Sequence, residues 1–98
     1  MYSVAEVKKA FAAEGLPLTV VWRGRRITDL SPRAWNLVGD FQVSVWPPIK
    51  KSGTILVLIQ AGHRTVRAGN VDVDYAPTSS MAASIRSAIA RLRRTKSR

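Results

Sequence analysis

The chain has 98 residues, of which 46% are hydrophobic, enough to bury one hydrophobic core but not two. Its net charge is +10, because 16 lysines and arginines face only six carboxylates, and a composition with 22% charged residues is far from that of a disordered chain. Since there is no cysteine, disulfides and thiolate metal ligands are excluded.

The first predicted element is an amphipathic helix over residues 4–14. Ser3 and Glu6 have the spacing of a capping box, in which each side chain satisfies a backbone N–H at the helix start. Apolar residues then recur at helical spacing. Gly15 stands where a residue with positive φ commonly ends a helix, and Pro17 prevents continuation.

Two strands are predicted next, over residues 18–22 and 27–30, joined by a basic turn. Ser31 followed by Pro32 has the pattern of a helix cap with proline at the first helical position, so residues 32–38 are expected to form one or two helical turns. These assignments place a hairpin and a short helix before the middle of the chain.

Residues 41–46 alternate between apolar and polar side chains, which indicates a strand with one buried face. Trp46 falls on the polar side of that alternation. Residues 54–59 are apolar on both faces of the predicted strand, as expected of a central strand that is covered on each side.

Gly69-Asn70 predicts a two-residue hairpin with a type II′ turn, in which glycine supplies the positive φ. A hairpin closed there sets Arg67 opposite Asp72 and Thr65 opposite Asp74, so that opposite charges support the register. The inner face of the second strand is then formed by three apolar residues, Val71, Val73 and Tyr75.

The last predicted element is an amphipathic helix with an apolar stripe at helical spacing, formed by Met81, Ile85, Ala88, Ile89 and Leu92. Both helices need an apolar surface to pack on. We therefore expect an α+β fold, a single antiparallel sheet of four to six strands with N-terminal and C-terminal helices packed on it. Residues 1–94 are predicted to form one domain and residues 95–98 a basic tail without fixed structure.

The order of helix, sheet and helix is similar to that of the double-stranded RNA-binding domain. That family carries a lysine cluster at the start of its last helix, whereas residues 80–84 open this helix without charge. The sequence is therefore not assigned to that family.

Catalysis and metal binding are not expected from these residues. None of the common nucleophile, phosphate-loop, zinc or dinucleotide motifs is present, and the one histidine, His63, is predicted to be an exposed loop residue. Asp72 and Asp74 share a strand face, but Arg67 and Thr65 are their predicted partners and no third ligand is in view. We expect a protein that is not an enzyme, with no cofactor, no metal and no small-molecule substrate.

Basic clusters are the feature that points to a function. Residues 86–98 carry six of the sixteen basic side chains and no carboxylate. Cations that neutralise phosphates release condensed counterions, so such clusters bind nucleic acid or another polyanion without reading sequence. The predicted contacts are Arg23, Arg25, Arg26, Lys50, Lys51, Arg67, Arg91, Arg93, Arg94 and Lys96.

The alternative interpretation is a protein interaction module or a homo-oligomer. It uses an open sheet edge or an exposed apolar surface formed by Trp46, Pro47, Pro48 and Ile49. The first nine residues carry charges where a signal peptide needs an apolar block, and no apolar run is long enough to span a membrane. A cytoplasmic location with no membrane span is therefore expected in either case.

Overall fold

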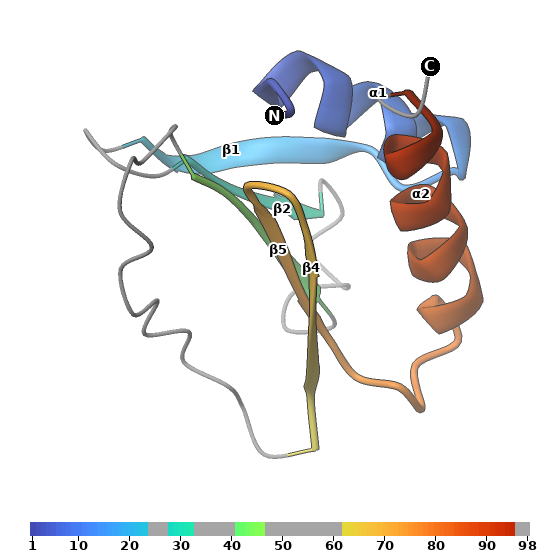
Figure 1. Ribbon diagram of the computed structural model, residues 1–98. Helices are drawn as coiled ribbons and strands as arrows, with labels where there is room; N and C mark the ends of the chain where they lie inside the picture. Colours follow the sequence, from blue (N-terminus) through green and yellow to red (C-terminus); the bar gives the residue numbers. More distant parts are fainter. Residues whose placement is uncertain (24–27, 33–40, 47–61, 96–98) are drawn as a thin grey trace.

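The computed structural model describes residues 1–23, 28–32, 41–46 and 62–95 (Figure 1). Within these ranges an antiparallel sheet carries two helices, which confirms the predicted α+β class. In chain order the elements are α1 (Val4–Ala13), β1 (Leu18–Arg23), β2 (Thr28–Pro32), β3 (Phe41–Val45), β4 (Arg64–Ala68), β5 (Val71–Tyr75) and α2 (Ala82–Thr95).

The described strands form one five-stranded sheet in the order β1-β2-β3-β5-β4, and each neighbouring pair is antiparallel. β1 and β4 are therefore the outer strands of the described sheet. The strand predicted for residues 54–59 lies outside the described residues, between β3 and β4 in the chain.

The β4–β5 hairpin has the predicted register, with Arg67 opposite Asp72 and Thr65 opposite Asp74. Gly69, at the first turn position, has φ 58°, and no residue other than glycine has a positive φ in the described ranges. This is the pattern of a type II′ turn. A side chain at Gly69 is also opposed by packing, since a Cβ would lie 3.1 Å from the ring of Tyr2.

The predicted β1–β2 hairpin is confirmed, although its register shifts between Val20 and Trp22. The prediction that Ser31 and Pro32 begin a helix is wrong, because both residues belong to β2, and the remainder of that predicted helix lies outside the described residues. Pro32 is tolerated because it is the last residue of the strand and pairs only with β1, so no ladder hydrogen bond to β3 depends on its missing N–H.

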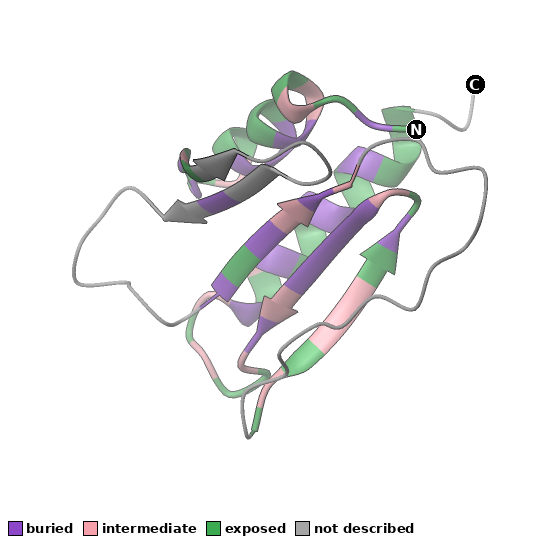
Figure 2. Cartoon of the chain, turned by 90° about the vertical axis from the view of Figure 1, so that its left-hand side faces the viewer, coloured by how far each residue is buried: buried purple, intermediate pink, exposed green. Residues whose placement is uncertain are grey.

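Both helices pack on one face of the sheet, and Figure 2 shows α2 behind the strands, with its buried residues turned toward them. The rings of Phe11 on α1 and Phe41 on β3 stack with centroids 6.0 Å apart. Burying such a side chain fully stabilises the fold by about 1.5–3 kcal/mol. The predicted stripe of α2 is confirmed, since Ile85, Ala88, Ile89 and Leu92 are buried and Met81 packs beside them.

The start and end of α1 follow the predicted signals. Ser3 and Glu6 form the capping box, each side chain accepting a hydrogen bond of 3.1 Å from the backbone N–H of the other residue. Gly15, with φ 75°, follows the C-cap residue Glu14. The helix thereby ends just before the chain enters β1.

Candidate functional site

The sheet face opposite the helices contains a buried carboxylate, Asp72 on β5, which is 3% exposed. Arg67 donates to it from Nε at 2.8 Å and from a terminal guanidinium nitrogen at 3.1 Å. The indole N–H of Trp46 donates to its second oxygen at 3.0 Å. The hydrogen bonds with Asp72 raise the pKa of Arg67 above its ordinary value. Charge-assisted bonds of this kind hold β4, β5 and the end of β3 together.

A second polar contact ties the N-terminus to the hairpin. The side chain of Asn70 accepts from the backbone N–H of Tyr2 at 2.7 Å and donates to the carbonyls of Tyr2 at 3.0 Å and Trp46 at 2.7 Å. The Asn70 carbonyl in turn accepts from the backbone N–H of Trp46 at 2.8 Å. One turn residue thus anchors both the first residues of the chain and the end of β3.

His63 is not the exposed loop residue that the sequence predicts, because its side chain is only 12% exposed and its Nδ1 lies 3.4 Å from Oδ1 of Asp74. The burial follows from strand pairing, since Asp74 is opposite Thr65 and His63 directly precedes β4. Among the described residues, these two atoms and Oγ1 of Thr65 are buried without a hydrogen-bond partner. Across the described ranges, no group of three or more histidine, cysteine, aspartate or glutamate side chains is arranged to hold a metal ion.

The C-terminal end of α2 reaches the outer strand β4 through Arg93. A terminal guanidinium nitrogen of Arg93 donates to the main-chain carbonyl of Arg67 at 2.9 Å. The main chain of Arg67 and the side chain of Arg93, 26 positions later in the chain, are therefore neighbours, while the Arg67 guanidinium is held by Asp72 on the sheet face opposite the helices.

Two further arginines extend this cationic surface. Arg86 is exposed and stands seven residues before Arg93, so both occupy the same flank of α2. Arg64 is exposed at the first residue of β4, the end of the strand next to the start of α2 (Figure 1). We refer to Arg64, Arg67, Arg86 and Arg93 as the β4–α2 strip.

The opposite flank of α2 faces α1 instead. There Arg91 donates from Nε at 3.2 Å and from a terminal nitrogen at 3.1 Å to one carboxylate oxygen of Glu14. This ion pair separates Arg91 from the β4–α2 strip, even though Arg91 and Arg93 both belong to the predicted contacts. Arg94, beside Arg93 in the last turn of α2, is exposed.

The remaining predicted contacts are distributed as follows. Arg23 is the last residue of β1, the outer strand at the other side of the described sheet from β4. Trp46 is half-buried and engaged with Asp72 through its indole N–H. Those outside the described residues are Arg25, Arg26, Lys50, Lys51, Lys96, Pro47, Pro48 and Ile49.

Sequence reasoning did not select Arg64 and Arg86 as contacts. The signal that identifies Arg86 is its seven-residue spacing from Arg93, which puts two cations on one helix flank. Arg64 has no such local signal, because its position depends on β4 lying at the edge of the sheet under α2.

These features define a small basic α+β domain with a cationic edge. Comparison of the chain with protein-family models, with curated proteins and with solved structures finds no match. In the part of the chain that the structure describes, neither helix has the length and apolar character needed to cross a membrane.

Proposed function

We propose that this chain is a non-enzymatic binding module that contacts the phosphates of nucleic acid through the β4–α2 strip, without reading base sequence. The observation that supports the proposal is the hydrogen bond from Arg93 to the main-chain carbonyl of Arg67, which brings the basic end of α2 to the strand that carries Arg64 and Arg67. Arginine suits this role because its planar guanidinium donates to two oxygens of one phosphate.

The charge of the strip is only partly compensated. Asp72 neutralises Arg67, whose side chain is nevertheless 51% exposed. Within the described ranges, Arg64, Arg86 and Arg93 form no ion pair with a carboxylate. The strip therefore presents more positive charge than the folded domain uses internally.

The length of the strip suits a polyanion better than a single phosphate. Arg93 lies seven positions after Arg86 on α2, which corresponds to about 10 Å along the helix axis. One strand of a duplex carries a phosphate about every 3.4 Å of its axis, so the two arginines span roughly three phosphates.

The test is binding of labelled single-stranded and double-stranded DNA and RNA, measured by fluorescence anisotropy between 50 and 200 mM salt. With about four phosphate contacts, the affinity is expected to fall on the order of a hundredfold over that range. The double variant R86Q/R93Q is expected to weaken binding to all sequences and to lower the salt slope by about two.

The matched control is K8Q/K9Q, which removes the same charge from α1, on the side of the described sheet where β1 lies. It is expected to leave the salt slope nearly unchanged. Absence of binding to every nucleic acid at low salt contradicts the proposal, and so does an equal loss of affinity in the two double variants.

A further inference from the structure

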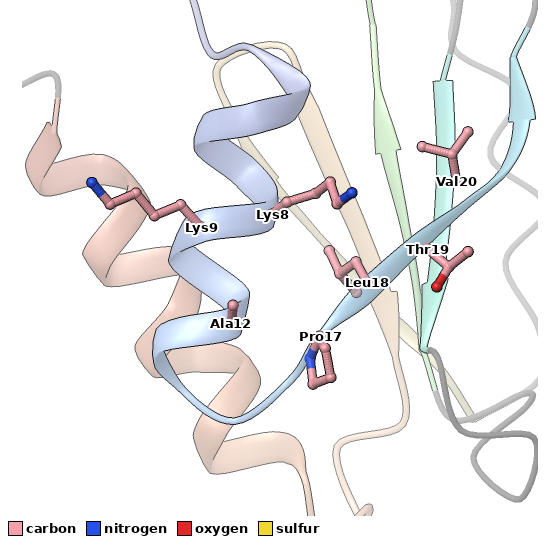
Figure 3. A pocket seen from close by; sticks show the side chains of 7 residues that line it. All are labelled: Lys8, Lys9, Ala12, Pro17, Leu18, Thr19 and Val20. Atoms are coloured by element: carbon pink, nitrogen blue, oxygen red, sulfur yellow. The ribbon is translucent and has the colours of Figure 1, made fainter.

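A second candidate surface lies on the other side of the molecule, in a groove of about 590 Å³ between α1 and β1 (Figure 3). Its walls come from one face of α1 and from the residues that enter and begin β1. The lining residues are Lys8, Lys9, Ala12, Pro17, Leu18, Thr19 and Val20.

The groove runs along the backbone edge of β1 rather than along one of its faces. Side chains of a strand alternate between the two faces of a sheet, so a surface on one face is lined by every second residue. Here Leu18, Thr19 and Val20 are consecutive, and all three line the groove. β1 is also an outer strand of the described sheet, and an outer strand has one edge whose N–H and C=O groups are not used by a neighbour.

The groove combines an apolar floor with a cationic rim. Leu18 is 4% exposed and Val20 packs against the core, whereas Val21, next along the strand, is 57% exposed. Figure 3 shows the Lys8 side chain reaching from α1 toward β1, while Lys9 extends away on the other side of the helix. Both lysines are exposed, and neither forms an ion pair in the described ranges.

We propose that this groove binds an extended acidic peptide segment of a partner protein, which adds to the edge of β1 as a further strand. The peptide backbone pairs with β1, its carboxylates approach Lys8, and alternate apolar side chains enter the groove. This inference is independent of the proposed nucleic-acid contact, because it uses the opposite edge of the described sheet.

The residues of the groove argue against the other occupants. A second copy of this chain is repelled by a net charge of +10 and offers only six carboxylates. A single-stranded nucleic acid needs aromatic platforms for its bases, and none of the lining side chains is aromatic. An extended peptide uses both the strand edge and Lys8.

The test is titration of the full chain with a fluorescein-labelled ten-residue peptide of alternating glutamate and valine. The comparison probes are a peptide of alternating lysine and valine, and a labelled oligothymidylate of similar charge. The acidic peptide is expected to bind, with an affinity that falls as salt is added. N-methylation of alternate peptide amides, on the edge that faces β1, is expected to abolish binding.

Two matched variants separate the groove from general electrostatics. Ala12 lines the groove and Ala13 does not, and both are exposed on α1. A12W is expected to weaken peptide binding at least tenfold by filling the groove, whereas A13W, the same substitution one residue later, leaves it unchanged. K8E/K9E is expected to abolish binding, and R86Q/R93Q to leave it within twofold of the original.

Equal affinity in A12W and A13W overturns the proposal, because the groove is then not the binding surface. Absence of binding by the acidic peptide, insensitivity to N-methylation, or tighter binding of the oligothymidylate than of the acidic peptide by R86Q/R93Q also overturns it. Since R86Q/R93Q and A12W act on different edges of the described sheet, failure of this proposal is distinguishable from failure of the nucleic-acid proposal.

Discussion

The two outer strands of the described sheet, β4 and β1, are protected in different ways. On β4, the side chain of Arg67 is held by Asp72, and its main-chain carbonyl accepts a hydrogen bond from Arg93 on α2. On β1, the neighbouring helix places Lys8 beside a groove while Lys9 extends away from it, and neither lysine side chain forms an ion pair in the described ranges. Among the described residues, a long cation therefore reaches the backbone of β4, and we expect the edge of β1 to be the more open to a further strand.

The two outer strands also differ in the contacts that hold them in the sheet. β4 and β5 pair without interruption over five residues each, and the buried carboxylate of Asp72 adds charge-assisted bonds to that pairing. β1 and β2 pair with a shift between Val20 and Trp22. We therefore expect β1 to unfold locally before β4. Regions held by fewer buried hydrogen bonds are the first to lose protection from hydrogen exchange.

The largest expected effect comes from removing the charge that holds β4. In D72N, one oxygen that now accepts from Trp46 and Arg67 becomes an amide N–H₂, which cannot accept either bond. Hydrogen bonds to charged groups contribute about 1.5–3 kcal/mol each and are not additive, so the free energy of unfolding is expected to fall by about 3 kcal/mol. Urea unfolding followed by circular dichroism measures this.

The matched control is D74N, two residues along the same strand and on the same face. Asp74 lies 3.4 Å from His63, and the facing atoms form no hydrogen bond. Its replacement is expected to cost less than about 1 kcal/mol, in the range of a weak ion pair. If D74N destabilises the protein as much as D72N, the network around Asp72 is not what secures β4.

The hairpin that carries this network was predictable from the sequence, and the strand order was not. Gly69-Asn70 fixes a two-residue turn, and the opposed charges of Arg67 and Asp72 select the register, so local information is sufficient. Nothing local states that β5 lies beside β3 and that β4 lies outside it. That order depends on the connection between β3 and β4, whose residues carry no turn signal that specifies a neighbour.

The candidate site was predictable to a similar extent. The charge run after Arg86 is visible in the sequence, but the separation of Arg93 from Arg91 depends on which flank of α2 faces β4 and which faces Glu14. The groove beside Lys8 has no sequence signature, because it arises where a helix and a strand edge diverge. Sequence patterns report local structure and composition, whereas these surfaces depend on tertiary packing.

A smaller effect is expected at the turn that closes the β4 side. In N70D, the side chain keeps the acceptor for Tyr2 N–H but loses the amide that donates to the carbonyls of Tyr2 and Trp46. A carboxylate also places negative charge against those two carbonyl oxygens. The free energy of unfolding is expected to fall by about 2 kcal/mol, since two hydrogen bonds of about 1 kcal/mol are lost.

The N-terminal residues give a local readout of the same variant. Because Asn70 anchors Tyr2, which is 8% exposed, N70D is expected to release the first residues and to speed their removal by an aminopeptidase. Unchanged proteolysis together with unchanged unfolding contradicts the role assigned to Asn70. A change in unfolding alone indicates that the turn is weakened while the N-terminus stays attached through other contacts, the Tyr2 ring against Gly69 among them.

The smallest expected effect tests whether Arg93 blocks the edge of β4. R93Q removes the guanidinium that donates to the Arg67 carbonyl at an exposed site, so the free energy of unfolding is expected to fall by only about 0.5–1 kcal/mol. The more informative change is in association. A strand edge that has lost its charged cover is open to pairing with another chain, and sedimentation at rising concentration is expected to detect self-association in R93Q.

R91Q is the matched control, because it removes the same charge from the same helix but breaks the pair with Glu14 on the opposite flank. Exposed pairs of this kind contribute about 0.2–1 kcal/mol, so both variants are expected to be similarly stable. Only R93Q is expected to associate. If both variants stay monomeric, the edge of β4 is protected by something other than Arg93, and if both associate, the cause is the lower net charge that the two variants share rather than an opened strand.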